Sequence, residues 1–208
     1  MCAASRTRGE SDKGELRRQQ VLEAATECFR REGFHGSSIA RISQAAGMSP
    51  GHIYHYFANK EAIVEAIAER EEHDIAELLR KLEQDREGGG LVDMLTRQTA
   101  EIVERNTDPA YAGLMLELAA EAARNPAVRK ILQRSEREIG GQFFRLVQRV
   151  GAPAALDDAE LQMRLQMIAL MFNGLTLRML NDPDFDLDAA ARLINGIIRF
   201  LLEEAPPR

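Results

Sequence analysis

The sequence predicts an all-α protein, and three observations support this fold class. Apolar residues recur three or four positions apart along nearly the whole chain, and no segment alternates convincingly with the two-residue period of a half-buried strand. Apolar residues make up 45% of the 208 residues, which is enough to form a sizeable core. Proline, glycine, serine and asparagine separate the apolar segments, as expected where helices start and stop. We therefore expect about nine helices.

The first sixty residues predict one long helix followed by two short ones. Gly33 follows the first apolar segment and is placed to end it, because glycine accepts the backbone geometry found after a helix. Ser38 is a favourable capping residue for the second helix, which Gly47 ends after two turns. Ser49 and Pro50 open the third helix in their preferred order. The three helices are expected at about 15–32, 38–46 and 50–57.

The rest of the chain predicts six longer helices. Asn59 is positioned to cap the first of them, and the glycine triplet 88–90 ends it. Aspartate or asparagine followed by proline, at residues 108–109 and 125–126, opens two further helices. The last two are unusually apolar, so they need cover from their own domain or from a second copy of the chain. These helices are expected at about 60–86, 91–105, 109–123, 126–150, 157–181 and 187–204.

The charge of the chain is divided unevenly. The net charge is −6, yet residues 1–60 carry nine Lys and Arg against six Asp and Glu, a net charge of +3. The remaining residues carry eighteen against twenty-seven, a net charge of −9. A basic N-terminal third on an acidic body is typical of a protein in which one module meets a polyanion, although a solvated basic face has the same composition.

Composition also bears on the compartment and on metal sites. Residues 1–14 mix charged and small polar side chains, so we expect a disordered tail rather than a secretory signal. No apolar run approaches the about 20 residues that span a membrane, and we expect a cytoplasmic protein. Cys2 and Cys28 are too few for a disulfide framework or a zinc site. We expect no metal and no cofactor.

Residues 47–57, GMSPGHIYHYF, contain two of the three tyrosines of the chain and two of its four histidines. Two short helices joined by a glycine turn and followed by a long helix form a helix-turn-helix, whose second helix enters the major groove of DNA. The imidazoles can donate to or accept from base edges and phosphates, and the tyrosine hydroxyls can reach phosphates. Ile53 and Phe57 are expected to face inward. The segment therefore predicts a DNA-reading surface.

Residues 37–67, SSIARISQAAGMSPGHIYHYFANKEAIVEAI, resemble the DNA-binding domain of TetR-family regulators. The shared features are the serine start, the alanine–glycine turn, a tyrosine seven residues after that glycine, and F-x-N-K-E before the next helix. Ser43 departs from the usual alanine, and Arg41 stands where it faces a phosphate or solvent. After the disordered tail that composition predicts at 1–14, the resemblance implies a helix-turn-helix domain at 15–60 and an effector-binding and dimerisation domain at 61–208. It implies DNA contacts by Ser38, Ser49, Pro50, Gly51, His52, Tyr54, His55 and Lys60.

The resemblance also implies a homodimer that reads a palindromic operator in double-stranded DNA and that a small apolar effector releases. The two apolar C-terminal helices support the dimer independently. The C-terminal part loosely resembles choline-sensing repressors. A site for a quaternary ammonium needs several tryptophans or tyrosines, and Tyr111 is the only one outside the DNA-binding domain, so choline is not expected. The candidate interface residues are Leu165, Phe172, Ile194, Ile198 and Leu201. The candidate pocket residues are Met94, Met115, Leu118, Phe143, Phe144, Met167 and Met171, each of which is also an ordinary core residue by type.

The sequence leaves alternatives open for the function of the protein and for the roles of single residues. One is a DNA-binding regulator of the same fold without a small-molecule ligand. An enzyme is disfavoured, because the chain has no phosphate-cradling glycine loop, nucleophile elbow or metal-ligand spacing. His52 and His55 are three residues apart but have no acidic or cysteine partner nearby for a metal. Glu117 and Glu121 either face a cationic ligand or form a solvent edge, and we favour the solvent edge.

Overall fold

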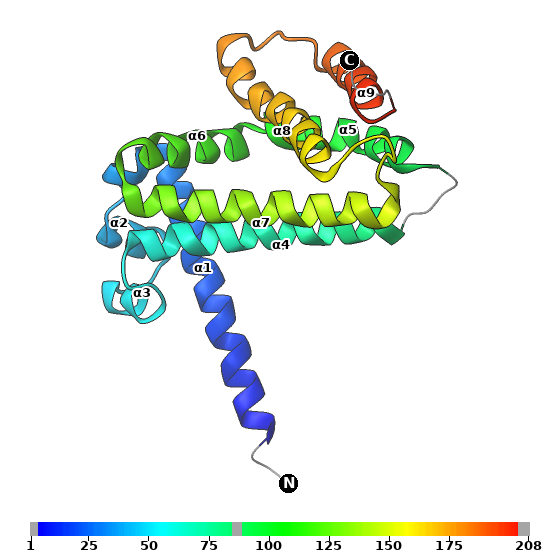
Figure 1. Cartoon of the computed structure of the whole chain (residues 1–208). Helices are drawn as coiled ribbons and strands as arrows, with labels where there is room; N and C mark the ends of the chain where they lie inside the picture. The colour runs from blue at the N-terminus through cyan, green and yellow to red at the C-terminus, as the bar shows by residue number, and fades with distance from the viewer. Residues whose placement is uncertain (1–3, 85–88, 204–208) are drawn as a thin grey trace. The chain divides into compact units, whose positions relative to one another are not determined.

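The computed structural model confirms the all-α class (Figure 1). It describes residues 4–84 and 89–203, with side chains from residue 13 onward. Nine helices lie within these residues. They are α1 (Ala4–Gly36), α2 (Ile39–Ala45), α3 (Pro50–Tyr56), α4 (Lys60–Gln84), α5 (Leu91–Thr107), α6 (Pro109–Arg124), α7 (Pro126–Gly151), α8 (Asp158–Asn181) and α9 (Leu187–Glu203).

The predicted boundaries agree with these helices within a few residues, except at the start of α1. The prediction began this helix near residue 15, whereas the structure begins it at Ala4. Extending a helix that has already formed adds one hydrogen bond per residue without a new nucleation cost, and no proline interrupts the chain before Pro50. The disordered tail expected at residues 1–14 is therefore helical from Ala4, and residues 1–3 lie outside the described part.

The chain forms two compact units. Unit 1 contains residues 1–71 and 113–134, and unit 2 contains residues 72–112 and 135–208. The helices α4, α6 and α7 therefore each contribute one part to unit 1 and the other part to unit 2. This division follows from contacts, whereas the expected boundary at residue 60 is a functional one and stays a prediction.

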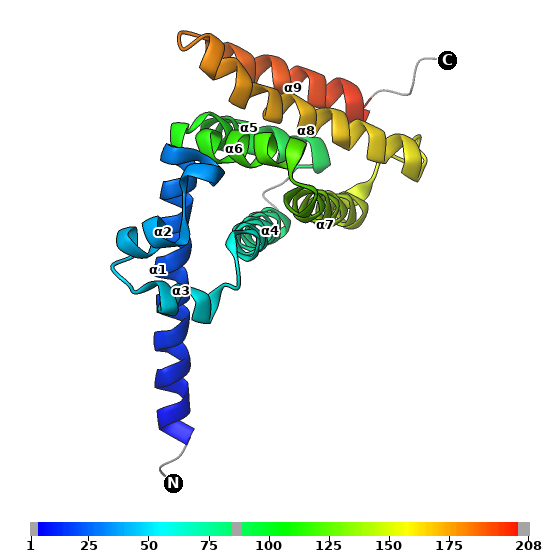
Figure 2. The same ribbon diagram turned by 90° about the vertical axis from the view of Figure 1, so that its left-hand side faces the viewer.

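Unit 1 has an apolar core built from α1, α2, α3, the start of α4, residues 114–122 of α6 and the start of α7. Figure 2 shows α2 and α3 beside α1. The inward positions predicted for Ile53 and Phe57 are confirmed, since Ile53 is fully buried and Phe57 is 3% exposed. Phe29 of α1 is also fully buried. Gly33 has a φ of 74°, which ends the regular part of α1 as predicted. The three N-terminal helices are thus fixed on one another by residues of unit 1 itself.

Unit 2 has a separate core in which α5 lies against α8 and α9. One apolar stripe of each of the last two helices lines this core. Polar side chains lock the same contacts, since the Thr99 hydroxyl donates to the Asn195 side chain and the Thr176 hydroxyl donates to the Asn106 carbonyl at 2.9 Å. The buried side chains of α8 and α9 include Leu161, Leu165, Ile168, Phe172, Leu175, Ile194, Ile198 and Leu202.

A second apolar stripe of α8 and α9 remains exposed, and we call it the outer stripe. The glycines Gly174 and Gly196 interrupt it, and a Cβ built at either would have no atom within 4 Å. None of the helices in the described ranges is both long enough and apolar enough to cross a membrane. The outer stripe consists of Met163, Met167, Leu170, Leu177, Leu180, Leu193, Ile197 and Phe200, each at least 41% exposed.

Candidate nucleic-acid interface

Helix α3 is held by its two ends and by one buried face. The Ser49 hydroxyl caps its first turn by accepting from the His52 backbone N–H at 3.4 Å, and Pro50 occupies the first helical position. At the other end the Phe57 N–H donates to the Ile53 carbonyl at 2.9 Å. Because both Ile53 and Phe57 are buried, the opposite face of this short helix is turned outward.

Seven of the eight residues predicted to contact DNA are exposed, of which six belong to α3 and its N-cap and one, Ser38, caps the start of α2. Tyr54 is 58% exposed, and the rings of His55 and Tyr56 meet edge to face with centroids 5.0 Å apart. This surface combines hydroxyls and imidazoles that can donate or accept hydrogen bonds at base edges and phosphates. The exposed candidates are Ser38, Ser49, Pro50, Gly51, His52, Tyr54 and His55.

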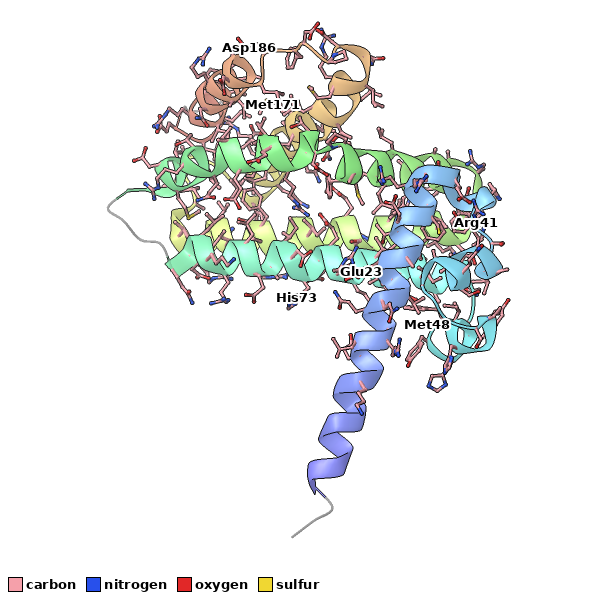
Figure 3. The ribbon with its side chains drawn as sticks, turned by 180° about the vertical axis from the view of Figure 1, so that it is seen from behind. Glu23, Arg41, Met48, His73, Met171 and Asp186 are labelled. Carbon is pink, nitrogen blue, oxygen red and sulfur yellow. The ribbon has the colours of Figure 1, made fainter. Side chains whose placement is uncertain are left out.

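The turn between α2 and α3 is anchored to α1. Gly47 has a φ of 62°, a conformation that disfavours other residues, and Met48 follows it with its side chain half-buried (Figure 3). The Gln20 side chain of α1 donates to the Ala46 carbonyl at 2.8 Å and so holds the end of α2. The Ser38 hydroxyl caps the start of α2 by accepting from the Arg41 N–H at 3.2 Å.

Lys60, the eighth candidate, is engaged within unit 1. Its ammonium donates to the Phe34 carbonyl and lies 4.0 Å from the centroid of the Phe34 ring. Partial burial of this ammonium lowers the pKa of Lys60 from its ordinary value. The side chain therefore ties the start of α4 to the end of α1, a role that the expectation of a phosphate contact did not include.

The two departures from the family pattern also make contacts inside unit 1. The Arg41 guanidinium binds Glu32 at the end of α1 through three hydrogen bonds of 2.7 to 2.9 Å. This ion pair raises the pKa of Arg41 and lowers that of Glu32. The buried Ser43 hydroxyl donates to the Ala40 carbonyl at 2.9 Å within α2. Arg41 thus faces Glu32, and Ser43 satisfies its hydroxyl without a partner from another helix.

The solvent edge favoured for Glu117 and Glu121 is wrong for Glu121, which is only 1% exposed. Its carboxylate accepts from Arg124 at 3.0 Å and from Asn125 at 3.1 Å, and it pairs with the His35 ring at 3.0 Å. The Glu117 carboxylate accepts from the Phe34 N–H at 2.7 Å. Helical spacing gave no sign of the contacts with Phe34 and His35, because these partners lie more than eighty residues earlier in the chain.

The structure does not bring the seven candidate pocket residues together. Met115 and Leu118 belong to the core of unit 1, whereas Met94, Phe143, Phe144 and Met171 pack in or against the core of unit 2. Met167 is 47% exposed on the outer stripe. The seven residues do not form one pocket because they lie on helices that contribute to two different cores.

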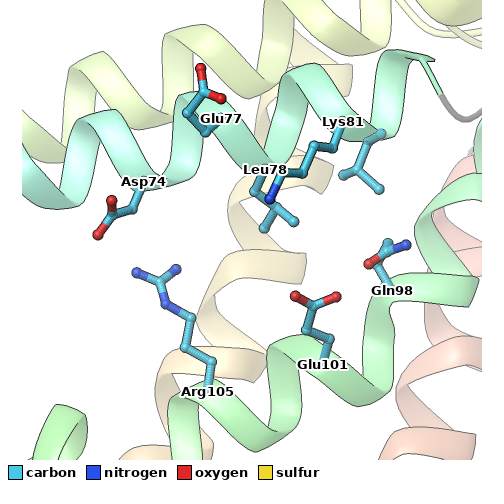
Figure 4. A pocket seen from close by; sticks show the side chains of 8 residues that line it. Asp74, Glu77, Leu78, Lys81, Gln98, Glu101 and Arg105 are labelled. Carbon is cyan, nitrogen blue, oxygen red and sulfur yellow. The ribbon is translucent and has the colours of Figure 1, made fainter.

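Unit 2 has a different cavity, between α4 and α5, with a volume of about 450 Å³ (Figure 4). Asp74 and Arg105 extend toward each other across it, and Gln98 and Glu101 project into it from α5. None of the candidate pocket residues contributes to its lining. The cavity is lined by Asp74, Glu77, Leu78, Lys81, Leu82, Gln98, Glu101 and Arg105, so six of the eight side chains are polar or charged.

The five candidate interface residues are not on the surface of unit 2. Leu165, Phe172, Ile194 and Ile198 are 2 to 7% exposed, and Leu201 is half-buried against the same core. Two apolar stripes run along each helix, and periodicity does not say which one turns inward. The apolar surface open to a second copy is the outer stripe instead.

Comparisons with known proteins agree with this geometry. Residues 21–67 match the sequence model of bacterial regulatory proteins of the tetR family. Residues 90–203, more than half of the chain, match the C-terminal domain of BetI-type transcriptional repressors.

Individual relatives and solved structures include proteins named as transcriptional regulators. The transcriptional regulator UidR of Escherichia coli is 32% identical over 118 residues, which cover 56% of this chain and 57% of UidR, so the chain matches only about half the length of that relative. The structure of Salmonella enterica GusR is 30% identical, with a TM-score of 0.72 over 91% of this chain and 96% of GusR. The FadR regulator of Bacillus subtilis, solved with stearoyl-CoA, shares the fold at 23% identity, with a TM-score of 0.67 over 88% of this chain and 97% of FadR.

A short helix with an exposed polar-aromatic face follows a braced glycine turn, and both parts of the chain match models of one kind of regulator. Members of this group are transcriptional regulators and not enzymes. The chain belongs to the TetR family of bacterial transcriptional regulators.

Proposed function

We propose that this protein is a homodimeric repressor that reads a palindromic operator with the exposed face of α3. The observation that carries the proposal is the rigid mounting of this face. Ile53 and Phe57 anchor α3 in the core of unit 1, while Tyr54 and His55 stand outward beside the exposed Ser49 cap. A reading helix must hold its side chains in register with base edges, which such anchoring provides.

The proposed dimer forms through the outer stripe of α8 and α9. Eight large apolar side chains exposed on two packed helices are more than a monomeric surface ordinarily carries, and Gly174 and Gly196 leave room for a partner helix to approach. Two copies related by a two-fold axis read two half-sites together, which gives specificity that one seven-residue helix lacks.

Selection of genomic DNA fragments by the purified protein tests this proposal. The expected outcome is a palindromic consensus that the protein protects in footprinting. His55→Ala should relax the base preference within each half-site, because it removes a side chain from the reading face. His73→Ala is the matched control, since His73 is an exposed histidine of α4 outside unit 1. Equal base preference in both variants would contradict the assignment of α3 as the reading helix.

We further propose that a small-molecule effector binds unit 2 and lowers operator affinity. The cavity between α4 and α5 favours a polar effector over the apolar one expected from the sequence, because its lining is mainly charged. Helix α4 connects the effector site to the DNA-reading unit, since its residues 60–71 belong to unit 1 and its residues 72–84 to unit 2. Typical coupling of about 1 to 3 kcal/mol would weaken operator binding about 5- to 150-fold.

Calorimetry separates this effector-controlled repressor from a regulator without a ligand. Compounds that raise the melting temperature of the protein are titrated into it with and without operator DNA. Linkage requires operator DNA to weaken effector binding by the factor by which the effector weakens operator binding. Gln98→Leu should reduce effector binding, whereas Gln148→Leu on α7, outside the cavity lining, should not. Equal affinities with and without operator would mean that the compound is not an inducer.

A further inference from the structure

The geometry points to a phosphate-binding pocket beside α3, built by Arg17 of α1 together with Ser49 and His52. This inference rests on the proposed function, because the phosphate belongs to the DNA that α3 reads. None of the eight residues proposed as DNA contacts lies on α1, so the pocket adds this helix to the interface.

The pocket has a volume of about 270 Å³ and lies within unit 1. Its lining carries one permanent cation, the Arg17 guanidinium, and no carboxylate. The cavity between α4 and α5, in contrast, is lined by three carboxylates and two cations. A lining with a cation, a hydroxyl and an imidazole but no carboxylate favours an anion with several oxygen acceptors. The lining residues are Arg17, Gly47, Met48, Ser49, His52 and Tyr56.

Gln20 positions the Arg17 side chain. Its amide nitrogen donates to the Ala46 carbonyl at 2.8 Å, and this bond fixes which end of the amide faces α2. The amide oxygen is then turned to Arg17, whose guanidinium donates to it at 2.9 Å. The same glutamine therefore braces the end of α2 and holds the cation at the pocket. Only one of the five N–H groups of an arginine is used by that bond, so others are available to an anion.

The position of the pocket favours a backbone phosphate over a base edge. Its lining includes Gly47 and Met48 of the turn before α3 and does not include the exposed Tyr54 and His55. A helix in the major groove has phosphates along both sides, and most hydrogen bonds to DNA from flanking residues go to those phosphates. Ser49 and His52 both line the pocket, with Ser49 Oγ 3.4 Å from His52 Nδ1, so they are expected to share the contact with Arg17.

The salt dependence of operator binding tests the pocket. Each phosphate contact adds about 0.9 to the slope of log K against log salt, so Arg17→Gln should reduce the slope by about 0.9 per half-site. Arg17→Lys should keep the slope, because it keeps the charge. Arg31→Gln is the matched control on the same helix, since Arg31 is 70% exposed and contributes nothing to this pocket. Thermal melting of all variants checks that they are folded.

The outcomes separate the pocket from the proposed function. The pocket is supported if Arg17→Gln has a reduced slope while Arg17→Lys and Arg31→Gln keep the slope of the wild-type protein. If the wild-type protein binds DNA with a steep salt dependence and Arg17→Gln has the same slope, the pocket is wrong and the repressor proposal stands. Equal reductions in Arg17→Gln and Arg31→Gln also overturn it, because they indicate a general charge effect. A wild-type protein that binds no DNA overturns both.

Discussion

The two units differ in how completely they bury their large apolar side chains. In unit 1 the large apolar side chains of α2, α3 and the start of α4 lie inside the unit, and the outward residues are mainly polar. In unit 2, α8 and α9 supply a complete core and still leave eight large apolar side chains exposed. The helices α2, α3 and the start of α4 thus bury their large apolar side chains within unit 1, whereas α8 and α9 carry apolar surface beyond what the core of unit 2 requires.

A change in the outer stripe is expected to have the largest effect. Leu170→Glu combined with Phe200→Glu should raise the dissociation constant of the dimer at least about a thousandfold, because an unpaired buried charge costs about 3 to 5 kcal/mol. Sedimentation measures this change. Ala100→Glu combined with Ala119→Glu adds the same charge at exposed positions on α5 and α6 and should leave the dimer intact. A stripe variant that still sediments as a dimer would place the interface elsewhere.

Truncation of the inner stripe is expected to act on the fold of unit 2 instead. Leu165→Ala should lower the free energy of unfolding by about 2 to 5 kcal/mol, because it leaves a cavity at a site that is 5% exposed. Urea unfolding at several protein concentrations distinguishes the two stripes. The loss in Leu165→Ala should be the same at every concentration, whereas the loss in Leu170→Ala should grow with dimer formation. The reverse pattern would exchange the roles of the stripes.

The break at the end of α1 offers a smaller effect within unit 1. Gly33→Ala should lower the free energy of unfolding by about 1 to 3 kcal/mol, because φ is 74° and an added Cβ would lie 3.1 Å from Glu117 Oε1. Gly14→Ala on the same helix is the control, since a Cβ there meets no atom within 4 Å. It should stabilise the protein by about 0.4 to 1 kcal/mol. Thermal melting compares the two, and a neutral Gly33→Ala would contradict the structure at this bend.

Lys60→Met is expected to have the smallest effect and decides the role of this lysine. If Lys60 mainly ties α4 to Phe34, its loss lowers the free energy of unfolding by about 1 kcal/mol and leaves the salt dependence of operator binding unchanged. If Lys60 contacts a phosphate, the slope falls by about 0.9 per half-site. Lys130→Met, an exposed lysine of unit 1, is the control for charge alone. The internal contacts favour the first result.

The sequence by itself determined the helices, because the signals that start and stop a helix are local. Ser38, Ser49 and Asn59 cap by accepting from backbone N–H groups three residues later, and Asp157 caps α8 in the same way. It also determined the outward face of α3, because a short helix between two caps has one apolar side to bury.

Only the tertiary structure decided which groups far apart in the chain meet. Periodicity identifies apolar faces but not their partners, so the sequence placed Leu165 and Ile198 in the interface although they fill the core of unit 2. The partners of Lys60, and of Glu117 and Glu121 on α6, likewise followed from packing, because charged side chains carry no local sign of a distant partner. A pocket joining Arg17 to His52 needs two helices to lie side by side, and that arrangement follows from packing of the whole core of unit 1.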